Sequence, residues 1–416
     1  KAGMSVQSPG GWYDAGDYGK YTINSAIALE SMLMGAEVYS KFYKNFDMEI
    51  PESTNNTPDV LDEAMYNLKW MLTMIDTVDG CVAHKVTTKG FVSMVLPAET
   101  NDQRYMIGKS TATNYGFAAI MAKASRLYKN NPDYPDFSEK AMRYAKQAYE
   151  WAERNPGIIF HNPDSIWTGS YTARFPEQFR FWANVELYLA TKEDKYVDLT
   201  AIDTFDYDVP TWQLPASLAL MSLITGVDNG TVKGALKKKT ELHFSKLATL
   251  LYDRMEKSAG CFPLHKFEWG SNGSMSNAGS ILLLQYRHTG DKKYLKAAQD
   301  ITTYLIGRNA TGYCFVTGYG KKSPMFIHDR RSTGDGIAVP VPGLIAGGPT
   351  LDAITDCDTY VYKYDHPKSE YPTREYSARA YNDEICSYST NEVAINWSAP
   401  FAMLLAGINE AMMNVK

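Results

Sequence analysis

Two aspartates near the start of the sequence form a candidate acid–base pair. Asp14 and Asp17 lie three residues apart in a glycine-punctuated, aromatic segment, residues 10–21. A general base needs an ionised carboxylate within hydrogen-bond reach of its nucleophile, and a second carboxylate can fix the orientation of the same water. The alternative interpretation is an N-cap and turn ahead of a helix that begins near Asn24.

Glu392 is a candidate proton donor. It stands where a loop enters an apolar helix, among aromatic residues that include Tyr388 and Trp397. An acid that keeps its proton near neutral pH needs apolar or like-charged surroundings, because these raise the pKa of a carboxyl group. The alternative is a glutamate at a helix start, where the helix dipole favours negative charge.

Several polar and aromatic side chains are candidates for substrate binding. His328 and Arg330 lie in a Gly/Pro-rich loop, where their N–H donors can be aimed at hydroxyls or at a carboxylate, although a surface salt-bridge loop is the alternative. Trp212 and Trp269 are candidate stacking platforms, with a place in the core as the alternative. The predicted binding residues are His328, Arg330, Trp269, Trp212, Tyr388 and Trp397.

Neither a metal site nor a disulfide framework is indicated. His84, Lys85, Asp203, Asp206 and Asp208 lack the spacing of an EF-hand loop, so we assign no metal to them. The cysteines are odd in number and have no CxxC or Cys/His metal spacing, so we interpret them as small buried hydrophobes. They are Cys81, Cys261, Cys314, Cys357 and Cys386.

Composition narrows the class of protein. With 44% hydrophobic and 21% charged residues in a 416-residue chain, the sequence predicts a globular protein with a large core. A net charge of −5 without a basic stripe argues against nucleic acid or an anionic membrane as partner. The longest apolar stretch, residues 399–408, is too short to span a membrane. The length predicts two or three domains unless the fold is a closed toroid or barrel.

Helical periodicity recurs along the whole chain, and no strand pattern is convincing. The predicted helices are Asn24–Lys44, Pro58–Asp76, Thr111–Lys129, Ser138–Asn155, Gln178–Thr191, Thr211–Thr225, Ala235–Lys257, Met275–Thr289, Lys292–Arg308 and Glu392–Met413. They come as short-looped pairs without a fixed repeat, which favours a closed toroid of helical hairpins over a solenoid. The long loops 80–108 and 311–391 are then where a site is expected.

These motifs, taken together and in this order, resemble glycoside hydrolase family 9. The matching segments are Gly-Trp-Tyr-Asp-Ala-Gly-Asp-Tyr-Gly-Lys-Tyr at 11–21, Thr-Pro-Asp-Val-Leu-Asp-Glu at 57–63, Gly-Arg-Asn-Ala-Thr-Gly-Tyr at 307–313, Phe-Val-Thr-Gly-Tyr-Gly at 315–320, His-Asp-Arg at 328–330 and Ser-Thr-Asn-Glu-Val-Ala at 389–394. The resemblance implies an all-α (α/α)6 barrel and an inverting cellulase. It also implies that Asp17 is the catalytic base, Asp14 helps to hold its water, Glu392 is the catalytic acid, and His328 and Arg330 bind substrate.

The sequence departs from the family pattern at several places. Cys314 stands where a small hydroxyl residue is expected, and Ser398 where Asn is expected. Residues 176–183 lack the Asp-Glu pair that serves as a calcium-site element in many members, so structural calcium is not supported and no cofactor is required. The family's first helix is apparently absent, as are an immunoglobulin-like module and a signal peptide. We therefore expect residues 1–416 to be a single, N-terminally incomplete catalytic domain.

The resemblance implies an endo-β-1,4-glucanase that acts on cellulose-like or related β-glucans. Alternatives are a variant substrate or exo-action, on xyloglucan, mixed-linkage glucan or short cello- or glucosamine-oligosaccharides, and a catalytically inactive glycan-binding toroid. The expected partner is a β-glucan, with a carbohydrate-binding or immunoglobulin-like module as an appended partner in the full protein. The expected location is secreted or cell-surface.

Overall fold

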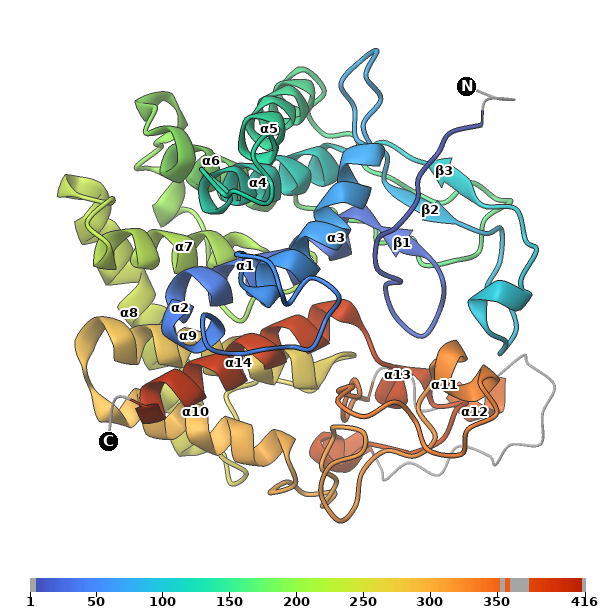
Figure 1. Cartoon of the computed structure of the whole chain (residues 1–416). Helices are drawn as coiled ribbons and strands as arrows, with labels where there is room; N and C mark the ends of the chain where they lie inside the picture. Colours follow the sequence, from blue (N-terminus) through green and yellow to red (C-terminus); the bar gives the residue numbers. More distant parts are fainter. Residues whose placement is uncertain (1–4, 352–355, 360–373, 414–416) are drawn as a thin grey trace.

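The structure is a computed structural model that describes residues 5–351, 356–359 and 374–413. Its long helices are α1 (Thr22–Val38), α3 (Asp59–Thr73), α4 (Thr111–Leu127), α5 (Phe137–Arg154), α6 (Pro176–Thr191), α7 (Ala216–Asp228), α8 (Gly234–Lys257), α9 (Ser271–Thr289), α10 (Lys292–Leu305) and α14 (Ile395–Met413). Short helices are α2 (Ser40–Tyr43), α11 (Arg330–Gly334), α12 (Asp356–Thr359) and α13 (Tyr388–Asn391). Figure 1 shows these elements in chain order.

The predicted helices are all present, which confirms the mainly helical fold. Their ends follow local chemistry: Ser110 caps α4 by accepting a hydrogen bond from the Thr113 N–H, and α9 ends at Gly290, whose φ of 73° is left-handed. The helix predicted from Thr211 begins only at Ala216, after Pro215. The first predicted helix is broken at Tyr39 into α1 and α2.

The expectation of no strands was wrong. Strands β1 (Lys20–Tyr21), β2 (Lys85–Thr87) and β3 (Tyr105–Ile107) form an antiparallel sheet in the order β1-β2-β3. Each strand has only two or three residues, which is too short to show an alternating pattern in the sequence. This small sheet holds the start of α1 against the loop that precedes α4.

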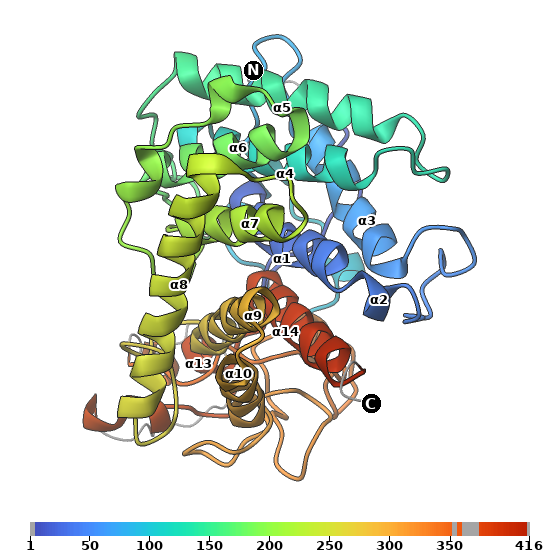
Figure 2. The same ribbon diagram turned by 90° about the vertical axis from the view of Figure 1, so that its left-hand side faces the viewer.

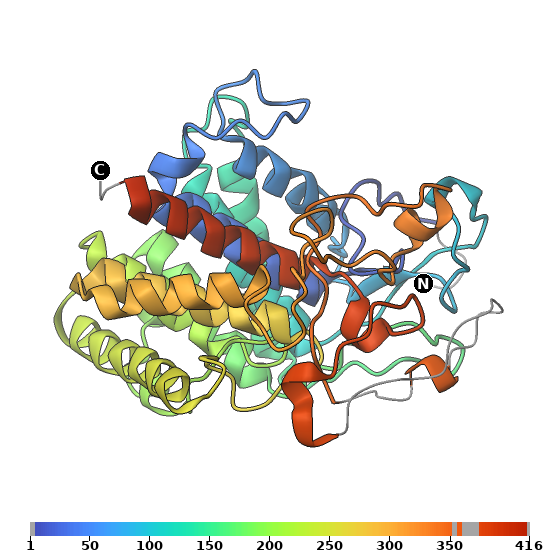
Figure 3. The same cartoon turned by 90° about the horizontal axis from the view of Figure 1, so that it is seen from below.

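Six helices form an inner ring among the described residues. Contacts run around the closed circle α1–α4–α6–α7–α9–α14–α1. Helix α7 is buried along nearly its whole length, as expected for a helix without a polar face, whereas the outer helix α5 buries a narrow stripe that includes Ala141, Ala145 and Ala148. Figures 2 and 3 show α5, α8 and α10 outside this ring and α14 alongside α1.

The chain enters the inner helices at one rim of the ring. Tyr171, shortly before α6, contacts Asp14, before α1, and its ring packs against Trp212, before α7. Trp397, in the first turn of α14, lies against Gly270, which precedes α9. Loops from distant parts of the sequence therefore meet at this rim, where Figure 1 shows the strands and the segments around α11 and α13.

A cluster of buried charges joins four of the inner helices. Lys123 of α4 is fully buried and forms ion pairs with Glu30 of α1 and with Glu186 of α6, the latter at 3.3 Å. Its Nζ also donates to Ser222 Oγ of α7 at 3.0 Å. Arg126, one helical turn further along α4, contacts Glu186 at 3.3 Å. The interior of the ring is thus held by charge as well as by apolar packing.

The interpretation of all five cysteines as buried and unpaired was wrong. Cys357 and Cys386 form a disulfide across 29 residues of sequence, close to the predicted acid Glu392. Cys81 and Cys314 are free and buried as expected, whereas Cys261 is exposed. Spacing alone did not indicate the pair because the bond joins the short helix α12 to a turn 29 residues further along the chain. Among the described residues, no helix combines the length and apolarity needed to cross a membrane.

The buried ion cluster leads to a stability prediction. Replacing Lys123 with Met leaves Glu30 and Glu186 buried without their shared cation, which costs about 3–5 kcal/mol of unfolding free energy for a broken buried pair. We expect a clear fall in melting temperature, measured by circular dichroism. The matched control is Lys109→Met, because Lys109 pairs with Asp79 at the surface and surface pairs contribute about 0–1 kcal/mol. Equal melting temperatures for the two variants would contradict the prediction.

Candidate active site

The loop that carries the two aspartates is fixed against α3. Gly11 has a φ of 79°, and a Cβ there would lie 2.3 Å from the Trp70 ring. The Trp12 indole donates to Glu63 Oε1 at 2.6 Å, and the Trp12 backbone N–H donates to Asn67 Oδ1 at 3.0 Å. These contacts explain why the loop needs its glycines and why it approaches α3 so closely.

Asp14 is buried and held by two side-chain donors. Asn24 Nδ2 donates to Oδ1 at 2.6 Å, and the Tyr171 hydroxyl donates to Oδ2 at 2.5 Å. The Asp14 carbonyl accepts from the Ile395 N–H at 2.9 Å, which attaches this residue to the first turn of α14. Asp14 is therefore a rigid carboxyl group at the point where α1, α6 and α14 meet.

Asp17 is buried but less tightly held. The Gly19 N–H donates to Asp17 Oδ2 at 3.0 Å, and the Tyr21 hydroxyl lies 3.5 Å from the same oxygen. Both contacts fall on Oδ2, so within the described part of the chain the other oxygen is the one suited to a water molecule. A carboxylate with one oxygen fixed and the other open has the geometry of a general base.

Glu392 reaches the aspartate loop from the far end of the chain. The Gly16 N–H donates to Glu392 Oε1 at 3.3 Å, a contact across 376 residues of sequence. The Glu392 backbone is fixed by a bridge to His328 and by the Gly347 N–H, which donates to its carbonyl at 2.8 Å. The structure thus brings together the three predicted catalytic carboxyl groups.

Burial raises the pKa values of all three carboxyl groups, and the charge of Asp17 adds to this effect on Asp14 and Glu392. Burial, and then the charge of Asp17, raise the pKa of Asp14 to about 7. Burial raises the pKa of Asp17, opposed chiefly by the Arg330 charge and the Gly19 N–H. Burial, then Asp17 and Asp14, raise the pKa of Glu392 well above its usual value. Burial and the neighbouring carboxylates therefore favour the protonated form of Glu392, which is the form that a general acid requires.

His328 and Arg330 are buried beside this loop, so the alternative of a surface salt-bridge loop was wrong for them. The Arg330 backbone N–H and Nη1 both donate to the Gly16 carbonyl, at 3.1 and 2.6 Å, and its Nε donates to the Val92 carbonyl at 2.8 Å. His328 Nδ1 lies 2.7 Å from the Ile385 carbonyl. Burial lowers the pKa of His328 to about 4, so the ring is neutral. Contact with substrate stays a prediction for both residues.

The predicted aromatic residues form two groups near the carboxyl groups. In one group Trp269, which is 44% exposed, packs at 5.6 Å from Tyr388, whose ring is 5.9 Å from His328. In the other group Trp212 packs at 5.0 Å from Tyr171, the donor to Asp14. Partly exposed rings are suited to stacking on sugar faces.

Trp397 has different surroundings. Its indole lies within 4 Å of the Cβ positions that side chains at Gly270, Gly273 and Gly347 would occupy. Only glycines leave room for the ring there, so Trp397 locks α14 to α9 and to the loop before Glu392. The contacts support a positioning role for this side chain.

Sequence reasoning missed Gly16, Asn24 and Tyr171. Gly16 stands inside the aspartate motif, and a Cβ there would lie 2.0 Å from the His328 carbonyl oxygen, so its place in the motif was a signal that could have been used. Asn24 follows the motif at helical spacing. Tyr171 is in an irregular loop 157 residues from Asp14, and nothing in the sequence indicates the contact.

The residues considered for metal binding have other partners. His84 lies between Thr113 Oγ1 and the Ser170 carbonyl, at 2.7 and 2.9 Å. Asp203 contacts His243, and Asp208 contacts Arg254. In the described ranges, no three His, Cys, Asp or Glu side chains are grouped to hold a metal.

The segment aligned with the family's calcium element is also unsuited to a metal. Pro176 opens α6 without offering a side-chain ligand, and Glu177 is exposed to solvent. These residues do not fit a calcium ion.

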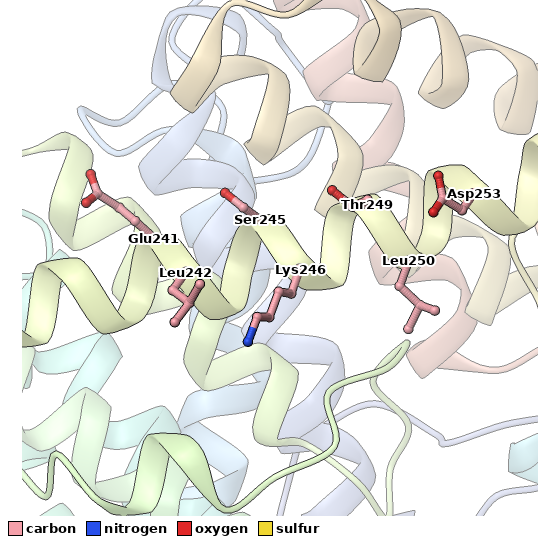
Figure 4. A pocket seen from close by; sticks show the side chains of 7 residues that line it. All are labelled: Glu241, Leu242, Ser245, Lys246, Thr249, Leu250 and Asp253. Atoms are coloured by element: carbon pink, nitrogen blue, oxygen red, sulfur yellow. The ribbon is translucent and has the colours of Figure 1, made fainter.

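A hollow along α8 lies away from this rim. Figure 4 shows that its lining side chains all project from one helix. They are Glu241, Leu242, Ser245, Lys246, Thr249, Leu250 and Asp253. Because a single helix lines this hollow, whereas loops from distant parts of the chain meet at the rim, we assign the site to the rim of the ring.

Comparison with known proteins agrees with this ring and its cluster of carboxyl groups. The model of glycosyl hydrolase family 9 matches residues 1–405. The xyloglucan-specific endo-β-1,4-glucanase BoGH9A of Bacteroides ovatus is 36% identical, over 100% of this chain and 71% of its own length. Endoglucanase D of Acetivibrio thermocellus is 31% identical, over 95% of this chain and 60% of its own length.

Solved structures give the same result. A structure described as Bacteroides ovatus GH9 superimposes with a TM-score of 0.87 at 34% identity, covering 99% of this chain and 74% of that one. The structure of a metagenome-derived family 9 endoglucanase superimposes with a TM-score of 0.86 at 29% identity, covering 98% of this chain and 72% of that one. The fold and site thus define a glycoside hydrolase of the (α/α)6 barrel class, as predicted. The chain belongs to glycosyl hydrolase family 9.

The close approach at Gly16 leads to a prediction. Gly16→Ala places a methyl group against the His328 carbonyl, so the aspartate loop must move away from Glu392. We expect a loss of kcat/KM on a soluble β-glucan of about 100-fold, because small misplacements of reacting groups are this costly. Gly90→Ala is the matched control, since its new Cβ meets only the Trp167 ring at an ordinary 3.6 Å. Full activity in Gly16→Ala would show that the contact is dispensable.

Proposed function

We propose that this chain hydrolyses internal β-1,4-glucosidic bonds of β-glucans with inversion at the anomeric carbon. The observation that carries the proposal is the contact of Gly16 with Glu392, which sets a carboxyl group of raised pKa beside the loop of the base Asp17. An inactive glycan-binding toroid would have no reason to keep both groups. The curated relatives are longer than this chain, so the activity of the whole protein is part of the proposal.

In the proposed reaction Glu392 gives its proton to the glycosidic oxygen as the bond from that oxygen to the anomeric carbon breaks. A water molecule attacks the same carbon from the opposite face, and Asp17 takes the proton that the water loses. At the anomeric carbon one C–O bond breaks and one C–O bond forms. Glu392 loses a proton and Asp17 gains one. The single displacement inverts the configuration because no glycosyl-enzyme forms.

Asp14 is proposed to hold the water rather than to take its proton. Its two oxygens already accept hydrogen bonds from Asn24 and Tyr171, which fixes the carboxyl group beside Asp17. With a pKa of about 7, Asp14 also carries less negative charge than an exposed aspartate. The smaller negative charge on Asp14 repels the carboxylate of Asp17 less, which favours the ionised form of the base.

The substrate-binding role predicted for the aromatic residues is retained for Trp269, Trp212 and Tyr388. Their partly exposed rings lie in two groups near the carboxyl groups and suit a neutral, hydroxyl-rich polymer. We propose that Arg330 positions the aspartate loop, because its guanidinium group donates to the Gly16 carbonyl. We propose that Trp397 positions α14, because its ring packs against the backbone of glycine residues.

Xyloglucan is the second candidate substrate. One specific observation favours it, namely 36% identity to a relative described as xyloglucan-specific. Purified protein assayed on cellulose, mixed-linkage glucan and xyloglucan, with product sizes resolved over time, separates these substrates. Early products of many lengths support internal cleavage, whereas release of short products alone contradicts it.

We further propose that residues 1–416 act as one catalytic domain and that the protein is secreted or displayed on the cell surface. The family match along residues 1–405 supports a single unit. The Cys357–Cys386 disulfide supports an oxidising compartment, where such bonds persist. Polymeric glucan is also a substrate that is met outside the cell.

Stereochemistry tests the proposed function as a whole. A β-linked substrate must first release the α-anomer if Asp17 activates water while Glu392 protonates the leaving group. Proton NMR of the products, recorded before mutarotation, reads the anomer directly. First release of the β-anomer would mean a covalent intermediate and would overturn the mechanism.

Glu392→Gln tests the acid separately. Loss of the proton donor should slow hydrolysis of unactivated β-glucan by about 10²- to 10⁴-fold. An aryl β-cellobioside with an activated leaving group needs little protonation, so its rate should fall far less. On unactivated β-glucan the decline of kcat/KM at alkaline pH reports ionisation of Glu392 in wild type, and the residual activity of Glu392→Gln should lack this decline. Equal losses on both substrates would assign the acid elsewhere.

A further inference from the structure

Lys85 is a buried lysine next to the site that the proposed mechanism does not use. It lies in β2, and its side chain is inaccessible to solvent. Nζ donates to Asn162 Oδ1 and the Gly169 carbonyl, each at 2.7 Å, and to Thr168 Oγ1 at 3.2 Å. All three acceptors are neutral. A buried cation without a bonded carboxylate is costly, so its retention calls for a function.

Two aromatic rings complete the surroundings of this ammonium group. Nζ lies 5.5 Å from the centre of the Tyr21 ring and 5.6 Å from that of Phe160. Burial lowers the pKa of Lys85 to about 8, and the charge of Asp17 opposes this effect. Lys85 is thus charged at neutral pH, and Asp17 is the anion that acts on it.

The small sheet fixes Lys85 relative to the base. Lys85 pairs directly with Tyr21 across β1 and β2, and the Thr22 N–H donates to the His84 carbonyl at 3.0 Å. The Tyr21 hydroxyl lies 3.5 Å from Asp17 Oδ2. The paired strands therefore hold the side chain of Tyr21 between the ammonium group of Lys85 and the carboxyl group of Asp17.

Other titratable groups face Asp17 from the elements around it. Arg330 at the start of α11 is the second cation. Asp14 in the same loop and Glu392 before α14 are the neighbouring acids, whose pKa values the charge of Asp17 raises, and Tyr171 from the segment before α6 donates to Asp14. Beside Lys85, His84 has a pKa of about 4 and is neutral. Lys85 and Arg330 are thus the described cations that balance this acidic cluster.

We propose that Lys85 is a positioning residue whose buried positive charge, held by the 162–169 loop, favours the ionised form of the base Asp17. The inference rests on the proposed function. Electrostatic coupling is reciprocal, so an anion that stabilises the ammonium is itself stabilised by it to the same extent. Lys85 also ties the loop before Tyr171 to β2, so the same side chain orders the residues that hold Asp14.

The test compares the acid side of the pH profile of kcat/KM in variants that keep or remove this charge. An aryl β-cellobioside with an activated leaving group serves as substrate, since its hydrolysis depends on the base and little on Glu392. Lys85→Gln keeps donors but removes the charge. It should move the acidic decline to higher pH by about 0.5–1 unit, equivalent to a loss of about 3- to 10-fold at pH values below the midpoint.

Three further variants sharpen the comparison. Lys85→Arg keeps the charge and should leave the midpoint near that of wild type. Lys109→Gln removes a lysine charge at the surface next to β3 and should leave it unchanged. Asn162→Asp places a carboxylate against Nζ and should move the midpoint in the same direction as Lys85→Gln. If Lys85→Gln does not fold, the midpoint of Asn162→Asp tests the proposal in its place.

The outcomes are distinct. The proposal is supported if the acidic midpoint of kcat/KM moves to higher pH in Lys85→Gln or Asn162→Asp but not in Lys85→Arg or Lys109→Gln. Loss of activity at every pH with an unmoved midpoint would mean that Lys85 is only structural and would overturn it. An inactive wild-type protein would instead refute the proposed function.

Discussion

The site depends on the close contact between Gly16 and the segment that begins at His328. The Gly16 carbonyl accepts two hydrogen bonds from Arg330, and its N–H donates to Glu392. A side chain at this position would occupy the place of the His328 carbonyl. One residue without a Cβ thus sets the separation of the acid from the base, and the ring of helices serves to bring the two loops into register.

Burying three carboxyl groups together is unfavourable, and the surrounding structure compensates in different ways for each. Asp14 receives two strong donors, Asp17 has buried cations nearby, and Glu392 is left to keep its proton. The acid and the base are chemically identical groups, so their roles are set by what surrounds them. The inner helices supply those surroundings because the segments that lead into their N-termini meet at one rim.

Much of the fold could be predicted from the sequence, because apolar periodicity is a local property that each helix displays by itself. The catalytic carboxyl groups could also be predicted, since Asp14, Asp17 and Glu392 lie in distinctive motifs. Their partners could not: Tyr171 lies in an irregular loop, Lys85 lies in a strand of three residues, and the Cys357–Cys386 disulfide joins segments without a spacing rule. The strands of two or three residues are too short to leave a pattern.

The order of the site along the chain has a consequence for biosynthesis. Glu392 follows Gly16 by 376 residues, so the growing chain carries the base loop through that stretch of its synthesis without an acid. Helix α1 must likewise wait for α14, its neighbour in the ring. Products of premature termination would therefore lack both the acid and the closed ring, and would be inert and exposed to proteolysis.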